Sequence, residues 1–303
     1  MEYNILGKTG FRVSQLGLGG APLGGDFADG VTDKQVTEVV HRSLDLGINF
    51  IDTAPLYGRG ESERRIGEAL KGRKRDSVIL ASKAVMRGEA YNYENTIRSV
   101  ENSLKRLQTD VIDLLQIHEP DSWNFDEVMN GCYLALVKLK EQGKIRAIGV
   151  NGRDFDVLLP YLETRVFDTT QVFSRYMLID HSAKDEVFPL TRELNMGVIN
   201  GSVLGMGLLA DAPAKFIKQP MIDLAEERKA KLAFLRKTDP KGLIEPAMRF
   251  SYSCPDIHVT LTGTTSIRSL ELNAAYCDGK GLPQEDLDRI FAAFPSDPIE
   301  YRN

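Results

Sequence analysis

Short apolar runs alternate along the chain with longer segments whose apolar residues recur at helical spacing. Short runs rich in β-branched residues predict strands, and amphipathic segments of ten or more residues predict helices. We expect strands at residues 16–19, 49–52, 78–82, 112–117, 145–150, 169–172, 197–200 and 258–262. We expect helices between them at residues 34–46, 62–70, 93–107, 125–142 and 183–194.

The regular alternation of strand and helix indicates successive βα units around a parallel sheet. Eight such strands are the number found in a (β/α)8 TIM barrel. Two short runs at 3–6 and 12–15 flank a turn-forming Gly7-Lys8-Thr9-Gly10 and predict a hairpin, which we expect to close the barrel bottom. A doubly wound sheet is the competing architecture, but it leaves the hairpin and the eighth strand without a place. We therefore expect one barrel domain over residues 1–303.

Residues 205–246, between the seventh and eighth expected strands, are more polar than the rest of the chain. We interpret them as an inserted loop at the barrel mouth with a charged helix at 223–236. Loops of this kind commonly cover ligands.

Composition excludes several classes of protein. The chain has 303 residues, of which 42% are hydrophobic, which is enough for one large core. A net charge of -5 provides no basic surface for nucleic acid, and no run of about 18 apolar residues suits a membrane. Cys132, Cys254 and Cys277 are far apart and form no CxxC, which favours a reducing cytoplasm. The four histidines show no metal-ligand spacing, so we expect no metal.

A glycine-rich segment, residues 17–25, follows the first expected strand. It is not a GxGxxG fingerprint, because Pro22 stands where the third glycine belongs. It indicates either a surface loop or a close approach of backbone to a flat ligand.

Four polar residues follow or end three consecutive expected strands. Asp52 ends the second strand and leads to Tyr57, Lys83 follows the third, and His118 follows the fourth. Catalytic side chains of (β/α)8 barrels come from these strand ends, so we expect the four to converge. Asp52 and Lys83 suit each other as a buried ion pair, and a barrel-end salt bridge without catalysis is the structural alternative. A nearby ammonium is expected to lower the pKa of Tyr57 and to make it a proton donor to a developing alkoxide.

Segments 49–54, 57–58, 61–67, 82–83 and 110–118 resemble the signature regions of the aldo-keto reductase family, and the similarity extends to about Ala275. The resemblance implies that Tyr57 is the general acid in carbonyl reduction and the base in alcohol oxidation. It implies that Lys83 and Asp52 tune Tyr57, and that His118 orients and polarises the carbonyl oxygen.

The resemblance also implies NAD(P)(H) extended across the barrel mouth. Gly20 and Ala21 would meet the nicotinamide ribose, and Asn151 and Gln171 the carboxamide. The pyrophosphate would lie on Ser202, Leu204 and Gly207, with Gly205 permitting tight passage of the same loop. The adenosine end is assigned to Gly263, Thr264, Thr265, Ser266, Arg268 and Asn273.

The chain departs from the family pattern at several cofactor positions. Asn151-Gly152 stands where Ser-Asn is frequent, and Gly201 stands where an aromatic often stacks on the nicotinamide, with Tyr176 as a substitute. Gly263 replaces a lysine that often holds the 2'-phosphate, so both NAD and NADP stay open. Arg175-Tyr176-Met177-Leu178, Gly201 and residues 202–209 resemble the sugar dehydrogenases of the family, those for L-galactose or L-fucose.

The expected function is therefore NAD(P)-dependent hydride transfer to or from a small aldehyde, ketone or aldose. The alternative is a cofactor-binding regulatory subunit that senses redox state with little turnover. Trp123, five residues after His118, is either an apolar wall of the substrate pocket or a surface-packed side chain. The segment after Phe294 is short, from which we expect an open pocket.

Overall fold

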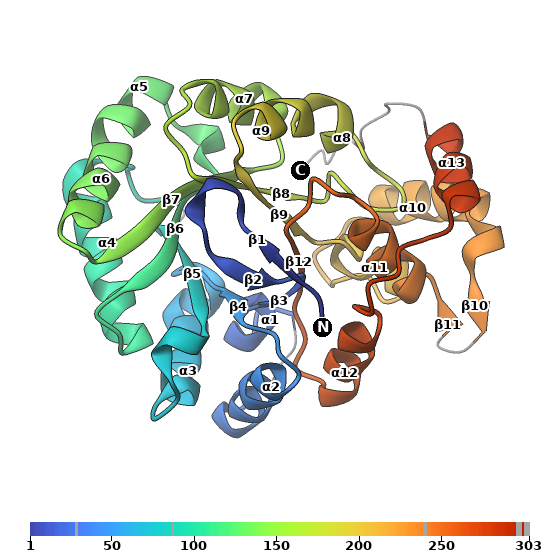
Figure 1. Cartoon of the computed structure of the whole chain (residues 1–303), viewed down its shortest axis with the longest axis horizontal. Coiled ribbons are helices and arrows are strands. Elements are labelled where there is room, and N and C mark those ends of the chain that lie inside the picture. The colour runs from blue at the N-terminus through green and yellow to red at the C-terminus, as the bar shows by residue number, and fades with distance from the viewer. Residues whose placement is uncertain (28–29, 87, 239–240, 295–298, 300–303) are drawn as a thin grey trace.

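The computed structural model describes residues 1–27, 30–86, 88–238, 241–294 and 299. Its central feature is a closed barrel of parallel strands in the order β12-β3-β4-β5-β6-β7-β8-β9 (Figure 1). The strands are β3 (Leu16–Gly19), β4 (Phe50–Asp52), β5 (Ile79–Ala84), β6 (Ile112–His118), β7 (Ile145–Gly152), β8 (Thr169–Phe173), β9 (Gly197–Gly201) and β12 (Val259–Thr262). The predicted (β/α)8 barrel is confirmed.

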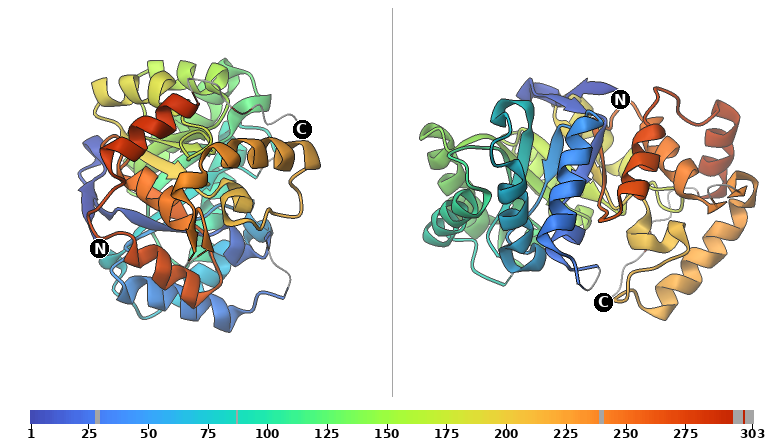
Figure 2. Two further views of the ribbon diagram at one scale, coloured as in Figure 1. Left: turned by 90° about the vertical axis from the view of Figure 1, so that its right-hand side faces the viewer. Right: turned by 90° about the horizontal axis from the view of Figure 1, so that it is seen from below.

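Helices surround the strands on the outside of the barrel (Figures 1 and 2). They are α1 (Ala21–Gly24), α2 (Asp33–Asp45), α3 (Glu61–Leu70), α4 (Tyr93–Leu107), α5 (Phe125–Val128), α6 (Leu134–Glu141), α7 (Phe155–Glu163), α8 (Ala183–Glu186), α9 (Phe188–Glu193), α10 (Gln219–Lys231), α11 (Ile244–Tyr252), α12 (Ile267–Ala275) and α13 (Gln284–Ala293). The main apolar core fills the space between these helices and the strands.

Two predicted helices are interrupted in the structure. The one expected at 125–142 contains a π-helical turn, Met129–Tyr133, between α5 and α6. Gly131 in this turn approaches the preceding loop so closely that a Cβ atom would stand 2.7 Å from the Tyr91 carbonyl oxygen. The helix expected at 183–194 divides into α8 and α9, with Pro189 in the first turn of α9. Proline has no N–H to continue the preceding turn, which explains the division.

The N-terminal hairpin closes one end of the barrel. Strands β1 (Tyr3–Ile5) and β2 (Arg12–Ser14) pair antiparallel. Leu6 and Val13 are fully buried in one apolar cluster with inward-facing residues of the barrel such as Phe50 and Leu114. Figure 2 shows the hairpin (blue) and α10 (light orange) toward opposite ends of the barrel.

The predicted insertion after the seventh strand is present, with its helix displaced toward the N-terminus. α10 begins at Gln219 instead of 223, because Pro220 suits the first turn of a helix. A two-stranded ribbon, β10 (Lys237–Thr238) and β11 (Lys241–Gly242), follows. No helix of the described part is long and apolar enough to cross a membrane. The expectation about the segment after Phe294 falls on residues 295–298 and 300–303, outside the described residues.

Candidate active site

The ends of β4 and β5 hold a buried ion pair. Lys83 Nζ lies 2.8 and 2.7 Å from the two carboxylate oxygens of Asp52, and it also donates to the Thr53 carbonyl oxygen at 2.9 Å. Lys83 is fully buried and Asp52 is 2% exposed. Three acceptors around one ammonium compensate for the loss of hydration, as a buried charge requires. The expected pairing of these two side chains therefore forms.

Tyr57 reaches this pair from the loop that follows β4. The chain turns sharply there, with Gly58 at φ 59° and its N–H donating to Asp26 Oδ2 at 2.9 Å. A Cβ atom on Gly58 would stand 2.3 Å from the Gly24 carbonyl oxygen, so the turn requires glycine. The Tyr57 ring centroid lies 5.0 Å from Lys83 Nζ and 6.1 Å from the His118 ring centroid, edge to face. The structure thus brings together all four residues that the sequence singles out.

The electrostatics at Tyr57 differ from the sequence-based expectation. Burial raises the pKa of Tyr57 above its ordinary value, and the opposing attraction of Lys83 does not offset it. The expectation of a lowered phenol pKa is therefore wrong, because loss of hydration outweighs the neighbouring ammonium. Burial disfavours the ammonium of Lys83 as well, but Asp52 and Tyr57 together more than offset this, so the pKa of Lys83 is raised.

A buried glutamine connects the ion pair to the next polar residue of the barrel. Gln116 on β6 donates from Nε2 to Gln171 Oε1 at 2.9 Å and lies 3.4 Å from Asp52 Oδ1. The sequence reasoning missed Gln116. Its signal was a polar side chain in an otherwise apolar stretch of strand, fully buried in the structure.

His118 ends β6, and contacts on both sides position it. Its carbonyl oxygen accepts a hydrogen bond from the Tyr91 hydroxyl. The next residue, Glu119, has a positive φ of 47°, and its N–H donates to Asn151 Oδ1 at 2.9 Å. Glu119 Oε1 lies 3.8 Å from His118 Nε2. The sequence reasoning missed Glu119 as well.

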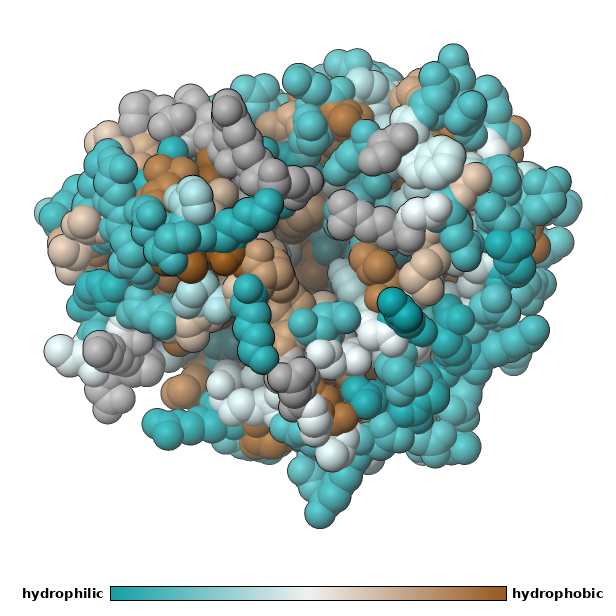
Figure 3. Space-filling model, turned by 180° about the vertical axis from the view of Figure 1, so that it is seen from behind, coloured by the Kyte–Doolittle hydropathy of each residue, from teal (hydrophilic) through white to brown (hydrophobic). Residues whose placement is uncertain are grey.

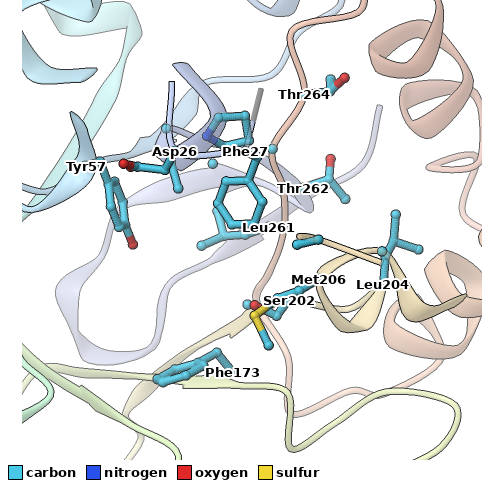
Figure 4. Close-up of a pocket in the computed structure, with 18 of the residues that line it drawn as sticks. Asp26, Phe27, Tyr57, Phe173, Ser202, Leu204, Met206, Leu261, Thr262 and Thr264 are labelled. Carbon is cyan, nitrogen blue, oxygen red and sulfur yellow. The ribbon is translucent and has the colours of Figure 1, made fainter. Parts of the chain in front are cut away.

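A cavity of about 890 Å³ opens beside Tyr57 at the carboxyl ends of the strands. Figure 3 shows a hollow in the middle of this face, and Figure 4 shows side chains of the cavity wall. Ten residues that we assigned to the cofactor line it: Gly20, Ala21, Asn151, Gln171, Ser202, Leu204, Gly207, Gly263, Thr264 and Thr265.

Four other expected cofactor residues are not among the described residues that line the cavity. Ser266 caps α12, accepting from the Ser269 N–H at 3.3 Å. Asn273 is buried and donates to Thr262 Oγ1 at 3.3 Å, and Arg268 is exposed on α12. Gly205 has φ +59°, a conformation that favours glycine, in the loop behind the residues that line the cavity.

Glycine backbone forms one wall of the cavity. A Cβ atom on Gly20 would stand 2.7 Å from Ser62 Oγ, and one on Gly263 would stand 2.6 Å from Pro22 Cδ. A side chain at either position would clash with its neighbours, so this part of the wall presents peptide groups to the cavity. Among the described lining residues, Lys215 is the one cation. A glycine wall, amide side chains and one ammonium suit a nicotinamide dinucleotide.

The structure places the aromatic candidates of the site and corrects one of them. Tyr176 is buried away from the cavity and stacks on Phe250, with ring centroids 4.7 Å apart, so it is not the aromatic beside the cofactor site. Phe173, at the end of β8, lines the cavity instead (Figure 4). Trp123 packs on Tyr91 at 5.8 Å and is not among the described lining residues.

Two phenylalanines meet over the cavity. Phe27, in the loop after β3, contacts Phe216 of the insertion edge to face, with centroids 5.6 Å apart. Both rings line the cavity (Figure 4 shows Phe27), and both are substantially exposed, at 41% and 56%. This contact joins the first and seventh loops of the barrel.

Comparison with known proteins agrees with this arrangement. The sequence profile of the aldo/keto reductase family matches residues 15–293. L-galactose dehydrogenase of Arabidopsis thaliana is 32% identical over 301 residues, covering 96% of this chain and 94% of that protein. D-threo-aldose 1-dehydrogenase of a Pseudomonas species is 28% identical, covering 88% and 90%.

A solved structure shares the whole architecture. The holo form of an aldo-keto reductase from Bacillus halodurans superimposes with a TM-score of 0.82 at 27% identity, covering 99% of both chains. Aldo-keto reductases are oxidoreductases that act on aldehydes and aldoses with NAD(P)(H). From its matched length and its fold, this chain belongs to the aldo/keto reductase family.

Proposed function

We propose that this chain, as one barrel domain over residues 1–303, catalyses reversible hydride transfer between NAD(P)(H) and a small aldehyde, ketone or aldose. The observation that carries the proposal is the Lys83–Asp52 ion pair beside Tyr57, with His118 against the phenol ring. This arrangement stands at one end of a cavity whose glycine wall fits a dinucleotide.

In this proposal Tyr57 transfers the proton. In reduction its hydroxyl donates to the carbonyl oxygen as negative charge develops there, and in oxidation the phenolate accepts the proton back. Burial raises the pKa of Tyr57, which keeps the phenol protonated through the neutral range. Bound in the cavity, NAD(P)H supplies the hydride.

Lys83 and His118 act on the charge that forms in the reaction. The Lys83 ammonium stabilises the phenolate left on Tyr57, and Asp52 keeps that ammonium charged and in place. The His118 imidazole polarises the carbonyl oxygen from the other side. Preorganised groups of this kind stabilise a developing oxyanion without reorganising during the step.

We assign each part of the cofactor to residues that line the cavity. We assign the nicotinamide ribose to Gly20 and Ala21, and the carboxamide to Asn151 and Gln171. Ser202, Leu204 and Gly207 hold the pyrophosphate, with Lys215 providing charge. Gly263, Thr264 and Thr265 line the adenosine end.

The substrate class is supported by the relatives. Two of them are named as dehydrogenases of sugars, L-galactose and D-threo-aldoses. Free, buried thiols at Cys132, Cys254 and Cys277 support a reducing cytoplasm as the compartment. We propose that the substrate is a small carbonyl compound or a sugar.

The test follows nicotinamide absorbance with NADH and NADPH against aldoses, simple aldehydes and their alcohols. We expect turnover, and we expect Tyr57→Phe to lower kcat by about 10²–10⁴-fold while cofactor binding persists. Tyr93→Phe, at an exposed tyrosine of α4, is the matched control and should keep full activity. Cofactor binding without turnover on any substrate would refute the proposed catalytic function and favour a regulatory subunit.

A further inference from the structure

The side chain of Gln116 crosses one strand of the barrel to reach Gln171. The two glutamines belong to β6 and β8, and β7 lies between them. Gly149 of β7 is the Cα partner of Gln116, and a Cβ atom there would stand 3.0 Å from Gln116 Cγ. A side chain at 149 would therefore crowd the path of Gln116. Glycine at this position leaves room for Gln116 Nε2 to donate to Gln171 Oε1 at 2.9 Å.

The Asp52 carboxylate fixes the orientation of both amides. A carboxylate only accepts hydrogen bonds, so Gln116 turns its nitrogen toward Asp52 Oδ1, at 3.4 Å. The other hydrogen of that nitrogen goes to Gln171 Oε1, which holds the oxygen of Gln171 toward Gln116. Burial raises the pKa of Asp52, and Lys83 and a hydrogen bond from Gln171 oppose this rise. Only the nitrogen of Gln171 can donate that bond, which agrees with this orientation.

The amide nitrogen of Gln171 lies beside the cavity. Gln171 lines the cavity, and so does Gly201 on the neighbouring strand. A Cβ atom on Gly201 would stand 3.5 Å from Gln171 Nε2, so the missing side chain leaves space next to this nitrogen. An amide nitrogen carries two hydrogens and can donate to Asp52 and to a ligand at once. A ligand atom at this point must therefore accept a hydrogen bond.

Packing alone does not explain a glutamine at position 116. The side chain is fully buried, and no residue in the described part of the chain donates to its Oε1. A buried acceptor without a donor costs free energy, which an apolar side chain would avoid. Leu114, two residues earlier on β6, is apolar and belongs to the cluster inside the barrel. The contribution of Gln116 is therefore its nitrogen.

We propose that Gln116 is a positioning residue for the cofactor. It holds the amide of Gln171 so that Gln171 donates an N–H to the carboxamide oxygen of the nicotinamide. The orientation of the nicotinamide thus depends on Asp52, whose carboxylate orients Gln116. This inference rests on the proposed function, which assigns the carboxamide to Gln171.

Calorimetric titration with the preferred reduced cofactor, NADH or NADPH, tests the proposal. Gln116→Met keeps the length of the side chain but removes its N–H groups, and we expect it to raise the Kd by about tenfold. Gln171→Leu should raise the Kd by a similar factor. The double variant should bind like Gln171→Leu alone, because a residue that acts through Gln171 has no effect once that amide is gone. Gln116→Asn, one methylene too short to reach β8, should behave like Gln116→Met.

The thionicotinamide analogue of the same cofactor provides a second measurement. Sulfur replaces the carboxamide oxygen in it, and sulfur is a weak hydrogen-bond acceptor. The unaltered protein should bind the natural cofactor about tenfold tighter than the analogue, and Gln116→Met should lose most of this preference. A variant whose barrel is merely loosened would bind both ligands more weakly and keep the ratio.

The matched control is Thr169→Val, which removes another buried polar group of the barrel interior at nearly constant volume. A Cβ atom on Gly149 would stand 2.4 Å from Thr169 Oγ1, so this hydroxyl borders the same space as Gln116. No described residue forms a hydrogen bond with Thr169 Oγ1. The Kd and the analogue ratio of Thr169→Val should match those of the unaltered protein.

The outcomes separate this inference from the function on which it rests. An unchanged Kd or an unchanged analogue ratio in Gln116→Met would overturn the role of Gln116, and so would additive effects of the substitutions at 116 and 171. Tyr57-dependent turnover in the same preparations would leave the proposed function intact. Failure of the unaltered protein to bind NADH and NADPH would overturn the proposed function, and the inference with it.

Discussion

Gly201, the last residue of β9, is the Cα partner of Phe173, the last residue of β8. A Cβ atom on Gly201 would stand 3.1 Å from the Phe173 Cβ, closer than most side-chain contacts. The absence of a side chain at 201 therefore makes room for the Phe173 ring in the cavity wall. Phe173, on the neighbouring strand, is therefore our candidate for the aromatic that the family resemblance places after the seventh strand.

From this relationship we expect Phe173→Ala to weaken cofactor binding. Loss of an aromatic face beside the nicotinamide should raise the Kd for the preferred cofactor by about tenfold, which corresponds to about 1.4 kcal/mol. Fluorescence titration measures it. Phe234→Ala removes an aromatic that contacts Arg289 outside the cavity, and its Kd should match the unaltered protein. Equal affinity in the two variants would contradict a contact between Phe173 and the nicotinamide.

The pH dependence of the two directions should differ. Burial raises the pKa of Tyr57 above the ordinary value of about 10, so the phenol stays protonated through the neutral range. Reduction uses the protonated form and should hold its rate until the pH approaches that raised pKa. Oxidation uses the phenolate and should rise with pH across the alkaline range. Steady-state rates at saturating cofactor test this, and a reduction rate that already declines between about pH 6 and 8 would contradict it.

Removing one partner of the buried Lys83–Asp52 pair should destabilise the fold. Lys83→Met leaves the Asp52 carboxylate buried without its ammonium and should lower the free energy of unfolding by about 3–5 kcal/mol. Adding Asp52→Asn to this variant should recover part of the loss. Urea denaturation gives the comparison. Arg165→Met breaks the exposed pair with Glu193 and should lower stability by less than about 1 kcal/mol.

From the residues at the adenosine end of the cavity we expect a preference for NADH over NADPH. Thr264 and Thr265 line it, Arg268 is not among the described lining residues, and a 2'-phosphate prefers a guanidinium or ammonium partner. We expect a lower KM for NADH, and we expect Thr265→Arg to lower the KM for NADPH by about tenfold. Thr265→Ser should keep the original preference. A lower KM for NADPH in the unaltered protein would refute the expectation, and Arg268→Ala would then show whether that residue reaches the phosphate.

The sequence by itself determined the barrel and the ion pair at its mouth. The strand and helix periods are local properties, and they persist in the structure with shifts of a few residues, apart from the two predicted helices that are divided. Because parallel strands of a closed barrel end on one face, polar residues at the ends of consecutive strands had to meet there. The pairing of Asp52 with Lys83 therefore follows from the order of the strands along the chain.

Only the tertiary structure decided the cavity wall and the electrostatics within it. Phe173, Glu119 and the Phe27–Phe216 contact come from segments far apart in the chain, and no local pattern reports which of them face the same space. Tyr176 lies away from the cavity because its ring packs on Phe250 in the apolar core. The pKa of Tyr57 is raised although Lys83 is close, because all the groups packed around the phenol exclude water from it. The sequence indicates the neighbouring lysine but not the extent of this burial.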